Sequence, residues 1–327
     1  MNTELTSNSK PASKLDRCRR VLISVLLLSV SAWPSDRADH FQPTLTRDFS
    51  SLAAELVNVA WADEETLAVA ADDCSVVLLT AETSRVLLPG HGECSTNGVA
   101  ISEREQLVGV AGTNSAFLSS IKQDSFRQQL KGTSLALAFP DNGSLSLVKP
   151  AEVAVLRRTG HHGYAIRRSV RVPHLRASTI DSTGTQAVAI DVNGALHSWD
   201  LADAIRESCT VPGAGFTHRL VIDQGEVYFS IRENGVSRVF LIDSHCKRSL
   251  LAELAGEEVS SIATSTELLA ISSRLGTLRI IDRRTGNPAH ECKVGLSAAA
   301  LAFSPSGKKL ALVLSDNRVE IWTVEKK

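Results

Sequence analysis

Short apolar runs recur about every forty residues from Leu52 to the C-terminus. Each run ends at an apolar residue before a turn, and successive ends are 40, 38, 41, 42, 41 and 40 residues apart. Seven residues mark these ends: Trp61, Ile101, Phe139, Ile180, Ile222, Ala263 and Phe303. A period near forty that is built from short strands predicts an array of four-stranded sheets, as in propellers.

The last segment shows the pattern inside one unit most clearly. Residues 297–303 and 310–314 are apolar and predict two strands, and residues 319–324 predict a third. The turn Ser304-Pro-Ser-Gly307 has Pro and Gly where tight turns favour them. The uninterrupted apolar run 310–314 is expected of a strand that is buried on both faces.

Two Asn-Gly pairs, Asn193-Gly194 and Asn234-Gly235, lie between short apolar runs of other segments. Asn-Gly supplies the positive φ angles of a two-residue hairpin turn, so we expect tight hairpins at both places. In the third segment, Pro150 is expected to interrupt the hairpin. A single sheet of this kind cannot bury both faces, whereas seven sheets stacked around an axis can. The sequence therefore predicts an all-β, seven-bladed β-propeller over residues 40–327.

Two segments carry a characteristic phrase. Residues 302–307 read Ala-Phe-Ser-Pro-Ser-Gly and are followed by an apolar strand and by residues 316–322, Asp-Asn-Arg-Val-Glu-Ile-Trp. The fourth segment ends in His197-Ser-Trp-Asp200, and it contains the dipeptide Trp199-Asp200. On these residues the chain from about 52 to 327 resembles the WD40-repeat family, strongly in two repeats and weakly in the others. The resemblance implies a seven-bladed propeller that serves as a rigid platform for other proteins.

The resemblance also implies that the N-terminal strand completes the last blade. The last segment stops after its third strand, so its outer strand has to come from elsewhere. The candidate is residues 41–49, whose side chains alternate adequately. Pro43 lies within this candidate, and proline is tolerated only on an edge strand, which an outermost strand is. We therefore expect residues 41–49 to pair with residues 319–324.

The N-terminus is distinct from the repeats. Basic residues up to Arg20 precede an uncharged, largely apolar run at residues 21–33, which is shorter than the roughly 20 residues of a spanning helix. A basic flank, a short apolar centre and small residues such as Ala32 indicate a secretory signal peptide over residues 1–32. An uncleaved membrane anchor, or a segment buried against the propeller, is the alternative. Residues 33–39 are interpreted as a linker, and the protein is expected to be exported to the periplasm or secreted, with a membrane-anchored or cytoplasmic location as alternatives.

The net charge limits the classes of partner that we expect. The formal net charge of −1 provides no bulk attraction to nucleic acid or to an anionic membrane, so we expect protein partners, and membrane contact only through an uncleaved N-terminal segment.

Cys18 would be lost with the leader, and five cysteines remain, which leaves at least one unpaired within a monomer. Cys74 and Cys94 are expected in loops that open on the same face, so they are a candidate disulfide. Reduced thiols at both positions are the alternative.

One stretch of the chain is strongly basic. No acidic residue occurs from Val153 to Ile180. Six arginines in and near this stretch are candidate partner-binding residues, because a guanidinium suits carboxylate and phosphate groups. They are Arg157, Arg158, Arg167, Arg168, Arg171 and Arg176. The alternative is an outer strand and loop whose arginines are solvated or paired with neighbouring acids.

The sequence offers little support for catalysis. The starts of the inner strands, which surround a propeller's axis, are expected at Glu55, Asn97, Thr133, Arg176, His218, Glu258 and Ser297. Of these, His218 and Glu258 are the candidates for an acid–base pair at the tunnel mouth. No catalytic motif, regular set of acids or CxxC spacing is present, and His161-His162 has no third ligand at a useful spacing, so no metal or cofactor is expected. The sequence favours a non-catalytic protein-interaction platform, with a ligand-binding or hydrolytic propeller as the alternative.

Overall fold

The computed structural model describes residues 42–90, 94–122, 127–140, 143–159, 163–211 and 217–324, and of residues 127, 217 and 218 only the backbone. The chain divides into two compact units, Met1–Arg37 and Ala38–Lys327. The first unit lies outside the described residues, as does the whole of the predicted linker 33–39, so the leader and the linker stay predictions. No helix long and apolar enough to cross a membrane occurs in the described ranges.

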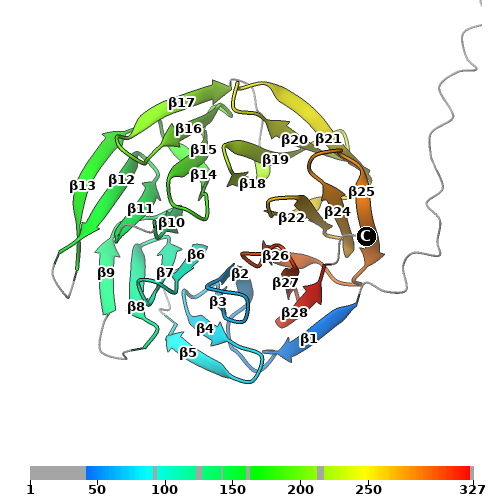
Figure 1. The fold of residues 1–327 in the computed structure, drawn as a ribbon, viewed down its shortest axis with the longest axis horizontal. Coiled ribbons are helices and arrows are strands. Elements are labelled where there is room, and N and C mark those ends of the chain that lie inside the picture. The colour runs from blue at the N-terminus through cyan, green and yellow to red at the C-terminus, as the bar shows by residue number, and fades with distance from the viewer. Residues whose placement is uncertain are drawn as a thin grey trace, which may run out of the picture. The chain divides into compact units, whose positions relative to one another are not determined.

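The second unit consists of seven four-stranded antiparallel sheets arranged as blades around an axis (Figure 1). The innermost strands are β2 (Leu56–Trp61), β6 (Thr96–Ser102), β10 (Ala136–Ala138), β14 (Leu175–Ile180), β18 (Thr217–Asp223), β22 (Val259–Thr264) and β26 (Ala298–Phe303). The second strands are β3 (Leu67–Ala71), β7 (Leu107–Gly112), β11 (Ser144–Lys149), β15 (Gln186–Asp191), β19 (Glu226–Glu233), β23 (Leu268–Ser273) and β27 (Lys309–Leu314). The third strands are β4 (Val76–Leu79), β8 (Ser115–Ser120), β12 (Glu152–Arg158), β16 (Leu196–Asp200), β20 (Val236–Ile242), β24 (Thr277–Asp282) and β28 (Arg318–Thr323). The outermost strands are β5 (Ser84–Leu88), β9 (Arg127–Lys131), β13 (Tyr164–Arg171), β17 (Arg206–Val211), β21 (Arg248–Ala255), β25 (Pro288–Lys293) and β1 (Pro43–Asp48).

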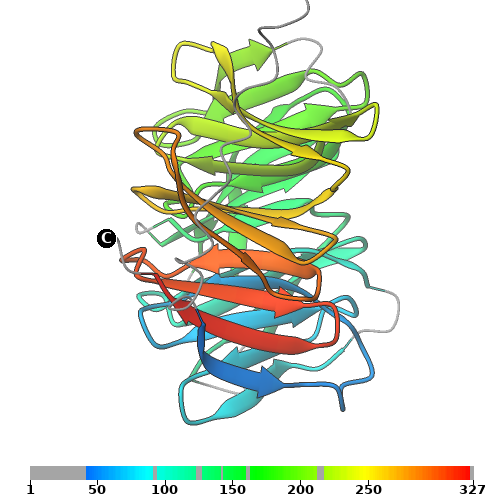
Figure 2. The same cartoon turned by 90° about the vertical axis from the view of Figure 1, so that its right-hand side faces the viewer.

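The predicted fold class is confirmed. The seven predicted ends of apolar runs all fall within one residue of the end of an innermost strand, as Trp61 does at the end of β2 and Phe303 at the end of β26. In the side view the blades stack face to face with their strands running roughly parallel to the axis of the ring (Figure 2). One sequence repeat therefore corresponds to one blade, except that the outermost strand of the last blade comes from β1.

The closure of the ring is confirmed as well. Strand β1 pairs antiparallel with β28, from Pro43 opposite Trp322 to Asp48 opposite Arg318, and it is the outermost strand of the last blade. The register shifts next to Pro43, as expected where a proline cannot donate to the ladder. Asn317 adds a second link between the last and first blades, because its Oδ1 accepts from Leu56 N at 2.9 Å. The two ends of the described chain thus stabilise the same blade.

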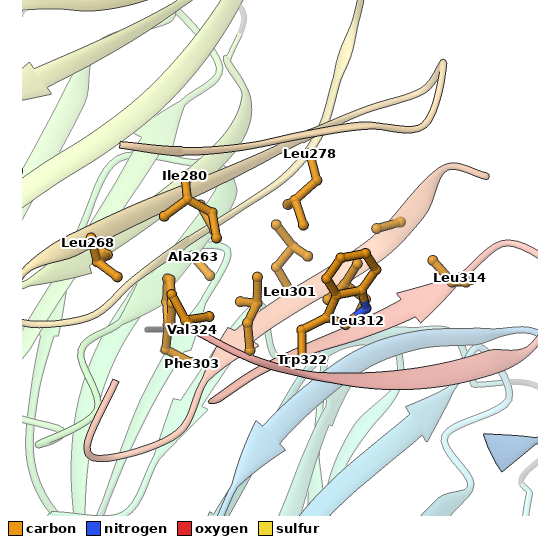
Figure 3. Packing of buried hydrophobic residues seen from close by; sticks show 13 residues of the cluster. Ala263, Leu268, Leu278, Ile280, Leu301, Phe303, Leu312, Leu314, Trp322 and Val324 are labelled. Atoms are coloured by element: carbon orange, nitrogen blue, oxygen red, sulfur yellow. The ribbon is translucent and has the colours of Figure 1, made fainter. Parts of the chain in front are cut away.

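The core lies between blades. Second strands such as β3 and β7 are buried at every residue, as predicted for strands covered on both faces, whereas β1 and β5 are largely exposed. Figure 3 shows one interface, in which Leu278 and Ile280 of the sixth blade meet Leu301, Leu312 and Trp322 of the seventh. Each fully buried Leu or Ile side chain contributes about 1.5–3 kcal/mol of hydrophobic stabilisation, and this burial is available only once a neighbouring blade has formed.

Of the two expected Asn-Gly turns, one agrees with the structure and the other differs. Asn234 and Gly235 both have positive φ, 52° and 78°, and form the predicted two-residue turn. At Asn193-Gly194 only Gly194 has positive φ, and the turn spans the residues between Asp191 and Leu196, so the two-residue hairpin was wrong there. The carboxylate of Asp191 accepts from the backbone N–H groups of Asn193 and Ala195, at 2.8 and 2.9 Å, and stabilises the longer turn.

The expectation at Pro150 was also wrong. Pro150 does not interrupt a hairpin, because it lies with Ala151 in the two-residue connection between β11 and β12, where Lys149 is paired with Glu152. Proline has no N–H to donate and its φ suits a turn. The third blade is therefore a complete four-stranded sheet.

Candidate functional site

The six predicted partner-binding arginines do not form one group. Arg157 and Arg158 lie at the end of β12, and Arg167, Arg168 and Arg171 lie on β13, so these five occupy the outer half of the third blade. Arg176 lies on β14, the innermost strand of the fourth blade, and lines the axial channel. A connection of only three residues, 172–174, carries the chain from the rim to the axis, which is why neighbours in sequence separate in space.

Two of the five rim arginines hold adjacent blades. Arg158 Nη1 lies 3.3 Å from Oε2 of Glu105 in the second blade. Arg168 Nη2 donates to the carbonyl oxygens of Leu201 and Ala202 beside the fourth blade, at 2.6 and 3.0 Å. These contacts tie the third blade to its two neighbours, so we assign both arginines to stability.

The other three rim arginines face solvent. Arg157, Arg167 and Arg171 are exposed, and none has a hydrogen-bond or ion-pair partner among the described residues. Arg167 is skipped where the register of β12 and β13 shifts, so it lies at a β-bulge. Next to it, Ile166 is 56% exposed. We call Arg157, Ile166, Arg167 and Arg171 the basic rim.

A second candidate site is the axial channel, which has two halves of about 630 Å³ each. One apolar residue from each innermost strand lines both halves and so lies where they meet: Val59, Val99, Leu137, Ile180, Val221, Ile262 and Leu301. The half at which the innermost strands begin has Arg176 and Arg219 as its charged lining residues, and we call it the basic mouth. The half at which they end has Asp181 and Asp223, and we call it the acidic mouth.

The predicted ring of strand starts is reproduced in part. Asn97 and Arg176 line the basic mouth as expected. Glu55, Glu258 and Ser297 directly precede β2, β22 and β26, and Thr133 lies three residues before β10, so these four stand outside the lining. The side chain of His218 lies outside the described part of the chain.

The described partners of Glu258 are two arginines, and its pairing with His218 stays a prediction. Its Oε2 lies 2.6 Å from Arg232 Nη1, and its Oε1 lies 3.1 Å from Arg274 Nε. Both carboxylate oxygens are therefore engaged by guanidinium groups from the fifth and sixth blades. A general base needs an oxygen that can reach the proton it accepts, and the contacts of Glu258 instead fit a salt bridge at the rim of the basic mouth.

At the acidic mouth the charges are matched. Arg283, whose side chain is 6% exposed, contacts Asp223, lies 2.8 Å from Oε2 of Glu226 and donates from Nε to the hydroxyl of Tyr228 at 2.7 Å. Burial, and then the hydrogen bond to Glu226, raise the pKa of Tyr228. Asp181 accepts from the backbone N–H of Gln186 at 2.7 Å. Every charge here has a protein partner, which is the pattern of a structural cluster.

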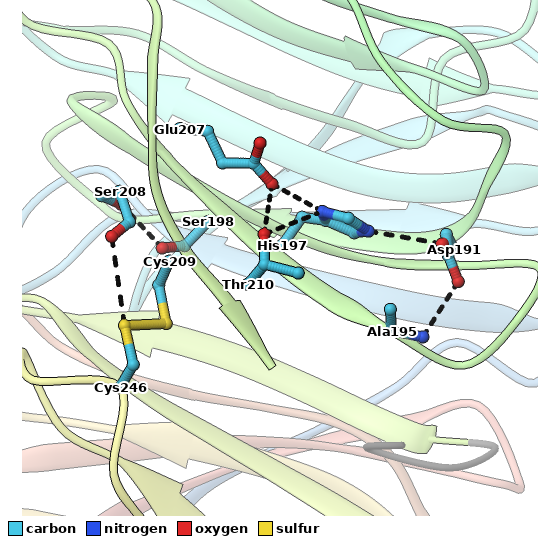
Figure 4. A network of polar contacts seen from close by, with 9 residues as sticks. All are labelled: Asp191, Ala195, His197, Ser198, Glu207, Ser208, Cys209, Thr210 and Cys246. Atoms are coloured by element: carbon cyan, nitrogen blue, oxygen red, sulfur yellow. Dashed lines mark hydrogen bonds and ion pairs between the residues drawn. A yellow bond between two sulfur atoms is a disulfide. The ribbon is translucent and has the colours of Figure 1, made fainter. Parts of the chain in front are cut away.

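A buried histidine in the fourth blade was missed at the sequence level. His197 Nε2 lies 3.3 Å from Asp191 Oδ2, and its Nδ1 lies 2.6 Å from Glu207 Oε1 (Figure 4). Its ring stacks on Trp199 with 5.8 Å between the centroids. Burial opposes ionisation of Asp191, but the amide of Ala195 and His197 outweigh it and lower the pKa of the carboxyl. The phrase His-Ser-Trp-Asp at 197–200 was a usable signal for this network, which links a turn to two strands.

The cysteines form two connections between blades. The structure pairs Cys74 with Cys94, with 5.7 Å between the Cα atoms, and so joins the first blade to the second. A Cβ on Gly112 would collide with both sulfur atoms, so glycine is required beside this pair. It also pairs Cys209 with Cys246, with 6.0 Å between the Cα atoms, a pairing that the sequence reasoning missed. Their separation of 37 residues, close to one repeat, was the available signal for contact between adjacent blades.

The remaining described cysteine, Cys292, is a free thiol. Burial raises its pKa to about 11, so it is protonated at neutral pH. No group of three or more His, Cys, Asp or Glu side chains is placed to hold a metal ion within the described ranges. His161 and His162 lie outside those ranges.

Comparisons with known proteins identify the fold. No protein-family model and no curated protein matches the sequence. The structure is similar to the β-propeller domain of Cps50 (Swd1) from Myceliophteria thermophila, with TM-score 0.66, 15% identity and coverage of 87% of this chain and 100% of that one. It is also similar to a chain of the mitotic checkpoint complex, with TM-score 0.68, 13% identity and coverage of 87% and 96%, and to U3-55K, with TM-score 0.68, 16% identity and coverage of 86% and 100%. These neighbours are WD40 β-propeller proteins, and this chain has their seven-bladed fold.

Proposed function

We propose that this chain is a non-catalytic platform for protein partners and that the basic rim is one of its contact surfaces. The observation that carries the proposal is the exposure, without a described partner, of Arg157, Arg167 and Arg171 on the outer strands of one blade. No acid occurs from Val153 to Ile180, and Glu152, which is opposite Arg171 in the ladder, forms its ion pair with Lys149. The unmatched charge favours an acidic protein segment as the partner.

The basic rim extends along the outer edge of the third blade: Arg171 is opposite Glu152, and Arg157 lies five residues further along β12, where alternation places it on the other face of the sheet. A guanidinium offers several donors in a rigid fork and binds carboxylates in a bidentate manner. Ile166 adds an exposed apolar side chain between charged ones, and an apolar centre with a charged surround is the usual composition of a protein interface. The similarity to a chain of the mitotic checkpoint complex is compatible with a role in a protein assembly.

Charge reversal tests the proposal. We expect the triple variant Arg157→Glu, Arg167→Glu and Arg171→Glu to lose at least tenfold in affinity for a fluorescent polyglutamate peptide, measured by anisotropy. Binding to the wild type should also weaken with added salt. The matched control reverses three exposed arginines elsewhere, Arg104, Arg206 and Arg284, with the same change in net charge.

A second measurement uses the natural partners. Proteins captured from extracts of the source organism by the wild type should be lost by the rim variant and kept by the control. If the rim variant captures the same set, or if both variants lose it equally, the basic rim is not the contact surface.

We also propose that the protein is exported. Four of the described cysteines form two pairs, and disulfides persist in oxidising compartments. N-terminal sequencing of the mature protein should give a start near residue 33, and a thiol titration should find one reactive thiol after denaturation. A chain that begins at Met1 and has all its thiols free would contradict export.

A further inference from the structure

The basic mouth differs from the rest of the channel in its lining. Among the described residues that line it, Arg176 and Arg219 are the charged ones, and the nearby carboxylate of Glu258 interacts electrostatically with Arg219. Asn58, Thr96 and Asn97 add polar groups from the first two blades. A concave, water-accessible site whose charged lining groups are guanidinium groups has the composition of an anion-binding site.

Arg219 is reached by solvent through the channel and is nevertheless surrounded by protein atoms. Its Nε donates to the carbonyl oxygen of Ser260, which orients the guanidinium across to the sixth blade. Burial, and then the charge of Arg274, lower the pKa of Arg219, and the carboxylate of Glu258 opposes this shift. A bound anion would place a further negative charge beside the guanidinium and favour its charged form.

The surroundings of the mouth add positive charge. Arg232 and Arg274 share the single carboxylate of Glu258, so this salt-bridge cluster carries a surplus of one positive charge. Glu55 also stands at this end, but it precedes β2 in the first blade, across the ring from β14 and β18 (Figure 1). The adjacent Glu257 lies 3.7 Å from Lys293, so the described ion pairs of Glu257 and Glu258 together carry a surplus of one positive charge.

We propose that the basic mouth binds an oxyanion, a phosphate or a carboxylate group, with Arg176 and Arg219 as its charged ligands. The volume of about 630 Å³ exceeds that of a single ion, so the group can be carried by a larger molecule that enters from this face. The apolar residues where the two halves meet limit the site to this half of the channel. The basic mouth shares no residue with the basic rim, so this proposal does not depend on the function proposed for the rim.

Isothermal titration calorimetry with two probes tests the proposal. Inorganic phosphate and succinate are titrated separately into the wild-type protein at an ionic strength held constant with sodium chloride. We expect saturable binding of at least one probe, and the probe that binds identifies the source of the oxyanion as phosphate or carboxylate.

Arg176→Gln is the informative variant, because Arg176 is exposed to the channel. It should weaken binding at least fivefold, whereas Arg176→Lys, which keeps the charge and removes the fork, should weaken it less. The matched control, Arg104→Gln, removes an exposed arginine from the turn between β6 and β7 and should change affinity less than twofold. Circular dichroism should show all variants folded.

The proposal is overturned if the folded wild type binds neither probe, or if Arg176→Gln binds as the wild type does. A loss of the same size in Arg104→Gln would also overturn it, since the effect would then be one of net charge. The rim variant with Glu at positions 157, 167 and 171 should retain anion binding in this assay, so failure at the rim and failure at the mouth are distinguishable.

Discussion

The two ends of the axial channel both use arginine, with opposite results. At the acidic mouth, Arg283 is buried and its donors are matched by Asp223, Glu226 and Tyr228. At the basic mouth, Arg176 and Arg219 line a water-accessible cavity, and no Asp or Glu is among its described lining residues. Matched charge at a buried position stabilises the contact between two blades, whereas an arginine that lines a water-accessible cavity can be reached by a ligand. The burial of the arginine, and not the residue type, distinguishes the structural cluster from the candidate site.

The largest effect is expected at the acidic mouth. Arg283→Met should lower the free energy of unfolding by about 3–5 kcal/mol, because it leaves two carboxylates beside the fifth and sixth blades without their cation. Urea unfolding monitored by circular dichroism measures this loss. A change below about 1 kcal/mol would mean that the matched cluster is not structural, and the contrast between the two ends would fail.

The next effect concerns the disulfide at the end of the propeller that carries the basic mouth. Cys74 lies in the turn between β3 and β4, at the end of the propeller that carries the basic mouth. Replacing Cys74 and Cys94 together by Ser should lower stability by about 3 kcal/mol in the chain-entropy model, for a loop of 20 residues. A reducing agent should destabilise the wild type and leave the double variant with the smaller response that the second pair, Cys209 and Cys246, contributes. Equal unfolding of the wild type and the variant under oxidising conditions would show that the pair is reduced in solution.

A smaller effect is expected from pH. Burial opposes ionisation of Glu226, but the hydrogen bonds from Tyr228 and Arg283 outweigh it and lower the pKa of the carboxyl. A lowered folded-state pKa contributes stability at neutral pH that is lost as pH falls below the ordinary glutamate value of about 4.3 and through the folded value. Because Glu226 is partly exposed, we expect its share to be at most about 1 kcal/mol. Glu226→Gln should show a correspondingly shallower loss between pH 5 and pH 3, and parallel curves would contradict the role of Glu226.

The smallest effect on stability is expected at the basic mouth. Arg176→Gln should change the free energy of unfolding by no more than about 0.5 kcal/mol, because the side chain is exposed in the channel. The same variant is expected to lose anion affinity. A substitution at the basic mouth should therefore change binding more than stability, whereas Arg283→Met at the acidic mouth should lower stability. A loss of several kcal/mol in Arg176→Gln would place this arginine with Arg283 as a structural residue.

Much of the fold could be predicted from the sequence because its signals are local. Apolar runs end at the same place in each repeat, and turn residues such as Asn234-Gly235 follow them within a few positions. The pairing of β1 with β28 was also predictable, since a blade with three strands exposes an edge that residues 41–49 were suited to cover. The turn at Asn193-Gly194 was wrong because a side chain, Asp191, competes for the backbone N–H groups and favours a longer connection.

The candidate sites were less predictable because they depend on contacts between blades. Six arginines close in sequence became a rim surface, two contacts between blades and one channel residue. The tunnel-mouth candidate Glu258 is engaged by Arg232 and Arg274, which lie 26 residues before it and 16 residues after it. The pair Cys209 and Cys246 likewise joins residues of two different repeats.

The sequence by itself determined the period, the strand order within a blade and the number of blades, because strand alternation and turn chemistry act over fewer than ten residues. The tertiary structure alone decided which charges are matched and which are left facing solvent. Each blade buries its faces only against its neighbours, so Arg158, Arg168 and Arg283 pair with Glu105, Leu201 and Asp223, which are each more than thirty positions away. Such pairings depend on the ring that forms when the blades stack, and no local pattern in the chain encodes them.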